Sequence, residues 1–415
     1  MKKLNWPLVN AWALYDFATV AFYMNIMSTY FALWVVNDHG ASDLTYALAK
    51  SLSMLVVALI SPLFGAMSDA AGTRRPFLAV CVVIYVAAAI VLGFTSHLWI
   101  GLVLFGIANI ALQLSTVLYN ALLPAISPPE TMGRVSGYGK MMSYIGSLVA
   151  VIIGMAFASG KLFGLDLPLP AGGSQAVFIP TALLVIVAAL PLLAVRHPAM
   201  PKGRGGHGTW RRLIADLRDA KALPGVGLFL LASFFFFDTI NTIRDFMSIY
   251  LVRVVGLSET GGSLQNFLLV LVLCSLVGAL FWGFVTDKAG PKKALVGVLS
   301  TMAVAFVGLV FIRDASLVMG LIGPVLGVAF GGVLVTTRPL LARLVPADRQ
   351  GEFFGLFILT NDFAAILGPI SWGLVVELLK DQGVVAYQAA LGLQLVFLLV
   401  GLYLVTRVRE PDLSP

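Results

Sequence analysis

Long apolar runs dominate the chain and predict its helices. A helix that crosses a bilayer needs ~20 apolar residues, and the chain contains twelve such runs, at about 10–36, 44–68, 76–95, 98–123, 135–158, 176–195, 225–254, 262–286, 294–312, 316–341, 353–377 and 385–406. Strands of a membrane barrel would be ~10 residues long and alternate in polarity, whereas these runs are longer and continuously apolar. The pattern therefore predicts an all-α membrane protein with twelve transmembrane helices.

Composition and charge agree with this interpretation and orient the chain. Of its 415 residues, 59% are hydrophobic and 11% charged, whereas a soluble domain has about 25% charged residues. The net charge is +7, but only four of the 27 Lys and Arg residues fall in the loops predicted outside: Lys161, Arg253, Arg313 and Lys380. This asymmetry places both termini in the cytoplasm. The expected location is a bacterial inner (plasma) membrane, with an uncleaved first helix.

The basic balance follows from this topology, so no nucleic-acid partner is expected. Cys81 and Cys274 lie in separate apolar runs, which predicts neither a disulfide framework nor a metal site. No cofactor is expected.

Two loop motifs repeat along the chain. GAMSDAAGTRRP (Gly65–Pro76) follows the second run, and GFVTDKAGPKKA (Gly283–Ala294) follows the eighth, 218 positions later. The same shift aligns LLPAISPPETMGRVSG (Leu122–Gly137) with LLARLVPADRQGEFFG (Leu340–Gly355). Because six helices separate the copies, each copy begins on the same side, which predicts parallel repeats.

Two six-helix halves that each carry G-x-x-x-D-x-x-G-x-[RK]-[RK] resemble the major facilitator superfamily over nearly the whole chain. WALYDFATVAF (Trp12–Phe22) is similar to the opening of its vacuolar effluxer-like branch, which is linked to autophagy and amino-acid export in fungi. The resemblance implies a cavity lined by the first, fourth, seventh and tenth helices. The expected domains are 1–195, a cytoplasmic linker 196–223 with a short amphipathic helix, and 224–415. A plain solvated linker is the alternative.

Polar side chains gather in a few of the predicted helices. A charge that faces lipid at mid-membrane costs at least ~3 kcal/mol, so these groups should face an aqueous cavity or one another. The candidates for substrate binding or coupling are Asp16, Asn25, Gln113, Tyr119, Asn120, Asp238, Asn241, Arg244, Asp245, Arg338 and Asp362. An acid in such a cavity can carry a proton, which predicts proton coupling.

A purely structural role would also bury these charges. Internal ion pairs that only fix helix packing, such as Arg244 with Asp16 or Asp245, would have this effect. Asp362 is either another cavity acid or part of a packing contact. Lys50 and Lys140 lie near predicted helix ends, from which their ammonium groups are expected to reach the membrane surface.

The duplicated motifs predict a gate on the cytoplasmic side. Gly65 and Gly283 would let helices approach closely. Asp69 and Asp287 would each face a helix N-terminus of the opposite half. The remaining candidate gating residues are Arg74, Arg75, Arg134, Lys292, Lys293 and Glu352. The alternative is that the motifs only anchor loops and retain positive charge inside.

These features predict a secondary transporter that works by alternating access. The effluxer-like resemblance suggests an amino acid, and the acids together with Arg244 would suit a zwitterion. A lipid or glycolipid flippase is the alternative, while a sensor or scaffold would need a long soluble domain that is not predicted within these 415 residues. An enzyme is not expected, because the sequence has no Ser/His/Asp arrangement, metal-ligand cluster or phosphate-binding loop. The expected partners are a small-molecule substrate, protons and the lipid bilayer, and the chain is expected to be a monomer.

Overall fold

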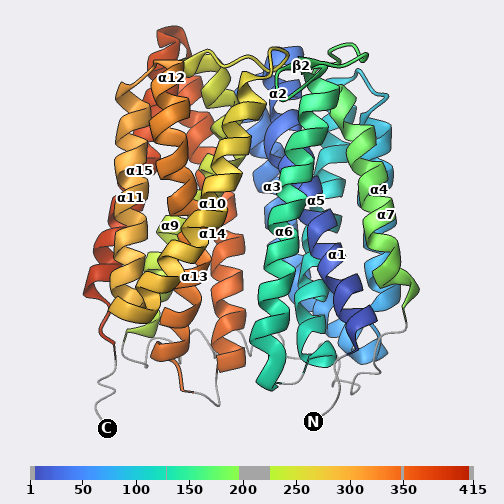
Figure 1. Ribbon diagram of the computed structural model, residues 1–415, viewed down its shortest axis with the longest axis vertical. Coiled ribbons are helices and arrows are strands. Elements are labelled where there is room, and N and C mark those ends of the chain that lie inside the picture. Colours follow the sequence, from blue (N-terminus) through green and yellow to red (C-terminus); the bar gives the residue numbers. More distant parts are fainter. Residues whose placement is uncertain (1–4, 128, 196–224, 347–349, 411–415) are drawn as a thin grey trace. The chain divides into compact units, whose positions relative to one another are not determined.

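The computed structural model describes residues 5–127, 129–195, 225–346 and 350–410 (Figure 1). Within these ranges, twelve helical segments are long and apolar enough to cross a membrane. Their ends lie within about four residues of the predicted runs, so the predicted all-α membrane fold is confirmed. The described strands are β1 (Lys161–Leu162) and β2 (Leu165–Asp166), which form a minimal antiparallel hairpin.

The chain divides into two compact units. Unit 1 contains Met1–Ala41, Leu52–Thr209 and Ser258–Gln265, and unit 2 contains Ser42–Ser51, Trp210–Leu257 and Asn266–Pro415. The predicted linker 196–223 and its amphipathic helix lie outside the described residues, so they stay predictions, as do the domain boundaries.

Unit 1 is a bundle whose helices run roughly side by side (Figure 1). Its first span is α1 (Trp6–Phe22), continued by the π-helical η1 (Tyr23–Tyr30), α2 (Phe31–Leu33) and the π-helical η2 (Trp34–Asp38). The other helices are α3 (Asp43–Ala71), α4 (Arg75–Leu92), α5 (Leu98–Ile126), α6 (Pro129–Ala158), the 3₁₀ turn η3 (Gln175–Val177) and α7 (Phe178–Ala194). Asn5 caps α1 by accepting a hydrogen bond from the backbone of Leu8, with Pro7 in the first turn, where no backbone donor is needed.

Unit 2 is built in the same way. Its elements are α9 (Val226–Tyr250) with the π-helical η4 (Leu251–Val255), α10 (Ser263–Ala289), α11 (Pro291–Phe311), α12 (Ala315–Leu317) with the π-helical η5 (Val318–Ile322), α13 (Gly323–Leu344), α14 (Gln350–Leu378), the 3₁₀ turn η7 (Lys380–Gln382) and α15 (Val384–Arg407). Gly290 precedes α11 at a positive φ of 87°, and Pro291 opens the helix. Glycine tolerates this backbone conformation and proline favours the first helical turn.

The helix contacts repeat between the units. In unit 1, α1 packs on α6 and α7, while α4 packs on α5 and α7. In unit 2, α9 packs on α14 and α15, while α11 packs on α13 and α15. Each helix of the second set follows its counterpart by about one repeat, so the packing supports the duplication seen in the loop motifs.

Two helices, α3 and α10, each contribute residues to both units, and they occupy equivalent positions in the two repeats. The segment Ser42–Ser51, which includes the start of α3, belongs to unit 2, and the segment Ser258–Gln265, which includes the start of α10, belongs to unit 1. Within unit 2, Ser51 donates a hydrogen bond to the carbonyl of Ile366 on α14 at 2.8 Å. Within unit 1, the Gln265 side chain donates to the Tyr30 hydroxyl at 3.1 Å. Each unit is therefore completed by a short segment of a helix that continues in the other.

Within the units, the glycines that bring helices together lie outside the loop motifs. Among the described atoms, none lies within 4 Å of a methyl group placed on Gly65, and on Gly283 such a group would meet Val335 at an ordinary 3.5 Å. In contrast, a methyl group on Gly331 of α13 would lie 2.0 Å from the carbonyl oxygen of Ser275 on α10. The closest α10–α13 approach is therefore made mid-helix rather than at Gly283, and the predicted role of Gly65 and Gly283 in bringing helices of the two halves together stays a prediction.

Candidate functional site

A row of polar side chains on α9 forms the main buried cluster of unit 2. Asn241 and Thr242 follow Asp238 by three and four residues, and Asp245 follows these two by four and three, which puts the four residues on one side of the helix. All four are buried. We call these residues, with Lys50, the α9 cluster.

An ion pair lies at one end of the α9 cluster. The ammonium Nζ of Lys50 on α3 is 3.4 Å from Oδ2 of Asp245, and each side chain is only 1% exposed. The expectation that Lys50 reaches the membrane surface is therefore wrong. The reason is tertiary: the first residues of α3 pack in unit 2, where Tyr46 also meets Phe246 at a ring distance of 5.2 Å.

The middle of the α9 cluster contacts α14. The Asn241 amide donates to the Asn361 side-chain oxygen at 3.1 Å. Asp238 is 1% exposed and faces the backbone of Gly368. A methyl group on Gly368 would lie 1.8 Å from the Thr242 hydroxyl oxygen and 2.9 Å from a carboxyl oxygen of Asp238. This glycine therefore lets α14 approach directly over two polar side chains.

A second cluster lies between α1 and α6 in unit 1. Oδ2 of Asp16 accepts a hydrogen bond from the Ser143 hydroxyl and lies 3.3 Å from the ammonium of Lys140. Lys140 is 43% exposed at its side chain, so it extends along α6 to this acid. Trp12, one turn earlier on α1, stacks on Tyr119 at 4.5 Å and donates to its carbonyl oxygen.

These contacts change how the predicted charges are interpreted. Asp16 and Asp245 both have lysine partners, Lys140 and Lys50, which were expected at the membrane surface. The suggested partner, Arg244, is exposed on an otherwise buried stretch of α9. Its side chain leaves the face that carries Asp245, as expected for adjacent helical positions.

The other predicted binding residues are scattered. Asn25 is buried and donates to Thr181 on α7 at 2.9 Å, inside unit 1. The Gln113 side chain contacts the sulfur of Met54 at 3.7 Å. Asn120 and Arg338 are exposed, and Asp362 is half-buried. Within unit 2, the structure therefore brings Asp238, Asn241 and Asp245 together.

The gate residues have contacts of their own. Arg74 donates to the carbonyl of Ala121 on α5, and Arg75 donates to that of Leu193 on α7. Cations suit these positions because carbonyls near a helix C-terminus lack backbone donors. Arg134, Asp287 and Lys293 are exposed. The side chains of Asp69 and Glu352 lie outside the described residues, so the proposed contacts of Asp69 and Asp287 with the opposite half stay predictions.

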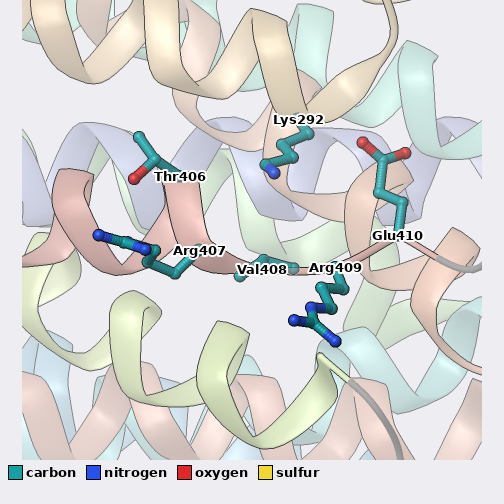
Figure 2. Close-up of a pocket in the computed structure, with 6 residues that line it drawn as sticks. All are labelled: Lys292, Thr406, Arg407, Val408, Arg409 and Glu410. Carbon is teal, nitrogen blue, oxygen red and sulfur yellow. The ribbon is translucent and has the colours of Figure 1, made fainter.

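An open cavity of about 520 Å³ lies at the end of α15, lined by Lys292, Thr406, Arg407, Val408, Arg409 and Glu410. Figure 2 shows the ammonium of Lys292 directed over the chain that leaves α15, while the guanidinium groups of Arg407 and Arg409 point in different directions. Glu410 is held by Arg343 at 3.6 Å. The lining includes none of the buried acids, so this cavity is separate from the α9 cluster.

An acid outside the membrane spans is held in unit 1. Glu259 precedes α10 and accepts a hydrogen bond from the Ser174 hydroxyl at 2.6 Å. Burial raises the pKa of Glu259 to about 7, the charge of Asp38 adds to this, and the Ser174 hydrogen bond opposes it. Gln265 also donates to the Glu259 carbonyl at 2.9 Å.

Lys50, Thr242 and Gly368 were not among the residues predicted for the site. Thr242 carries no sequence signal of its own, because hydroxyls are common in membrane helices, whereas the Gly368-Pro369 pair indicates a point where the helix can bend. Lys50 did carry a signal, since it is the only charged residue between Asp43 and Asp69. Lys50 is the seventh residue of the predicted helix, which is too far from its end for the ammonium to reach the membrane surface easily. This position could have identified Lys50 as a buried residue of the site.

Comparison with known proteins accounts for the twelve spans, the duplicated packing and the loop motifs together. The model of the Major Facilitator Superfamily matches residues 16–369 and, in a second alignment, 246–414. The chain belongs to the major facilitator superfamily.

Relatives within the superfamily differ in how much of the chain they cover. An uncharacterised MFS-type transporter of Bacillus subtilis, YxiO, is 26% identical over 380 residues, which is 87% of this chain and 86% of the relative. Autophagy-related protein 22 of Yarrowia lipolytica is 27% identical over 181 residues, covering 40% of this chain and 30% of that protein. The similarity to the autophagy-related branch predicted from Trp12–Phe22 is thus confirmed.

Solved structures show the same fold. A bacterial homologue of the human lysosomal transporter Spinster matches with a TM-score of 0.74 at 16% identity, covering 97% of this chain and 95% of the other. These relatives and neighbours are transporters rather than enzymes, and this superfamily member is likewise an integral membrane transporter.

Proposed function

We propose that this transporter moves a small zwitterionic solute, such as an amino acid, by alternating access coupled to protons. The observation that carries the proposal is the ion pair between Lys50 and Asp245, buried among the helices of unit 2. Opposite charges at 3.4 Å can open to receive a ligand that carries both charges. The ligand carboxylate would bind Lys50, and its ammonium would bind Asp245.

A zwitterion fits this pair for an electrostatic reason. Inserting a ligand with a single charge would leave either Lys50 or Asp245 without compensation in an apolar interior, which costs several kcal/mol. A zwitterion replaces one ion pair by two. The resemblance of Trp12–Phe22 to the effluxer-like branch suggests the same substrate class, and the relatives' names specify neither an amino acid nor a lipid as substrate.

Transport in proteoliposomes tests the proposal. Purified protein should exchange labelled neutral amino acids, and an imposed pH gradient should drive their accumulation. Labelled sugars and nucleosides are tested in parallel as alternative substrates. Exchange of a sugar or nucleoside without any amino acid exchange would overturn the zwitterion assignment, and accumulation that ignores the pH gradient would overturn the coupling.

Variants of the ion pair separate binding from packing. Lys50→Met leaves the buried Asp245 carboxylate without its lysine, so it should lower stability by about 3–5 kcal/mol. The double variant Lys50→Met/Asp245→Leu should regain most of that stability, because two apolar side chains replace the pair. If the pair binds substrate, the double variant should still lose at least tenfold in exchange per folded molecule although its stability is restored. The reason is that charge-assisted hydrogen bonds contribute about 1.5–3 kcal/mol.

The matched control is Lys380→Met. Lys380 is an exposed lysine paired with the carboxylate of Glu377 at 3.0 Å, and exposed pairs contribute little. Thermal unfolding and exchange of Lys380→Met should equal those of the wild type. A double variant at positions 50 and 245 that exchanged amino acids normally would show that the buried pair serves packing alone.

A further inference from the structure

A seam between α9 and α14 encloses an acid that the proposed ion-pair site does not use. Asp238 is 1% exposed, and within the part of the chain that the structure describes neither of its carboxyl oxygens accepts a side-chain hydrogen bond. The hydroxyl of Thr242, one turn along α9, is also buried without a partner there. Native proteins rarely leave such groups unsatisfied unless they have another use.

The surroundings of Asp238 offer no compensating charge. The charged residues on α9 and on the helices that contact it are Arg244 and Asp245 on α9, Asp43, Lys50 and Asp69 on α3, Arg338 and Arg343 on α13, Glu352, Asp362 and Glu377 on α14, and Arg407 on α15. None of these forms an ion pair with Asp238 among the described residues, and Lys50 lies at Asp245, two helical turns away. Burying an ionised carboxylate without a neighbouring positive charge would cost several kcal/mol of free energy.

The seam is also closed to larger ligands. Between Gly368 and Thr242 there is no room even for a methyl group, which would lie 1.8 Å from the hydroxyl oxygen. A metal ion would need several oxygen ligands arranged around it. A proton on the carboxyl group neutralises the charge and needs no further space.

We propose that the carboxyl group of Asp238, enclosed with the Thr242 hydroxyl against the backbone of Gly368, binds the proton that is exchanged during transport. The inference rests on the proposed proton coupling and assigns it to one residue. The proton is held while α9 and α14 are in contact at Gly368. Release requires water at the carboxyl group, so the two helices must separate there.

The sequence of α14 favours movement at this position. Pro369 lies within the helix and has no backbone N–H, so the carbonyl of Ala365 lacks its helical donor. Helices bend most readily at such points. Ser371 donates a hydrogen bond to the carbonyl of Gly368 at 2.8 Å, so a side chain bonds to the backbone in this turn.

Infrared spectroscopy tests proton binding without requiring transport. A protonated carboxylic acid has a carbonyl band separate from those of amides and carboxylates. Wild-type protein at neutral pH should show this band, alkaline pH should remove its Asp238 component, and Asp238→Asn should lack that component. The matched control is Asp166→Asn, which removes a carboxylate that is 85% exposed and should leave the band unchanged.

Several outcomes would overturn the assignment. A band equal in wild type and Asp238→Asn would exclude a protonated Asp238. If the band disappeared when choline was replaced by sodium at fixed pH, sodium would be displacing the proton, and the site would be a metal-ion site instead. If Asp238→Asn fails to fold, Thr242→Val should shift the band by removing the adjacent hydroxyl, and an unshifted band would count against the site.

Transport separates this inference from the proposed function. Asp238→Asn should lose at least tenfold in accumulation driven by a pH gradient and should retain amino-acid exchange, which needs no net proton movement. If wild-type transport ignored the pH gradient while the band still depended on Asp238, proton coupling would fail and the proton-binding site would stand. If pH-driven accumulation survived in Asp238→Asn, the site assignment would fail and the coupling would stand.

Discussion

The burial and the ion pairing of a single charged residue in this chain depend on which side chain the fold places beside it. Lys50 and Lys140 look alike in the sequence, as isolated lysines in apolar runs. Lys50 becomes a fully buried partner of Asp245, whereas Lys140 stays 43% exposed and reaches Asp16. Their different burial predicts different costs of removal, because a charge left alone costs more when solvent cannot reach it.

Glu259 gives a pH prediction at the same scale. Its pKa is raised by burial to about 7 from an ordinary value of 4.5, so the folded state binds the proton more tightly than the unfolded state. The stabilisation is complete below about pH 4.5 and is lost as the pH rises through about 7. Thermal unfolding temperatures of the wild type should therefore fall between about pH 5 and about pH 8 by more than those of Glu259→Gln.

The control for this comparison is Lys161→Gln, a change at an exposed ion pair on the same predicted outer side. It should leave the pH dependence of the wild type intact. Equal pH dependence of wild type and Glu259→Gln would show that the carboxyl group of Glu259 is not the group that titrates in this range.

At the scale of elements, helix contacts depend on glycines that the loop motifs do not contain. Gly146 of α6 faces the backbone of α1, where a methyl group would lie 2.4 Å from the carbonyl oxygen of Phe17. Backbone atoms cannot rotate away as a side chain can. The approach of α1 and α6, which also brings Asp16 to Ser143, therefore requires glycine here.

Gly146→Ala should accordingly lower stability, by about 1–3 kcal/mol, because overpacking forces the backbone to shift. Gly106→Ala on α5 is the matched control, since no described atom lies within 4 Å of the added methyl group. That change should raise stability by about 0.5–1 kcal/mol through the better helix propensity of alanine. Thermal unfolding of the two variants in one detergent measures the difference, and equal melting temperatures would contradict the close approach.

At the scale of the whole molecule, the distribution of basic residues predicts which side each loop occupies. Single cysteines at Thr73 and Lys293, both exposed, should be labelled from the cytoplasmic side in a background without Cys81 and Cys274. A cysteine at the exposed Phe163, between β1 and β2, should be labelled from the outside. Opposite labelling of positions 73 and 293 would contradict parallel repeats.

The sequence by itself determined the number, type and approximate limits of the helices, because spanning a bilayer requires long apolar runs and these are local features. It also determined the duplication, since the motifs at Gly65–Pro76 and Gly283–Ala294 are local strings. The rarity of charge in membrane helices made Asp16, Asp238 and Asp245 candidates before any contact was known.

Only the tertiary structure decided how those charges are compensated. Lys50 is 195 positions from Asp245 along the chain, and they meet because the first residues of α3 pack in unit 2. Asp238 is covered by Gly368 because glycine lets α14 approach α9 directly. Partner choice depends on which helices pack together and at which rotation, and an apolar run restricts neither, since many faces of such a helix are equally hydrophobic.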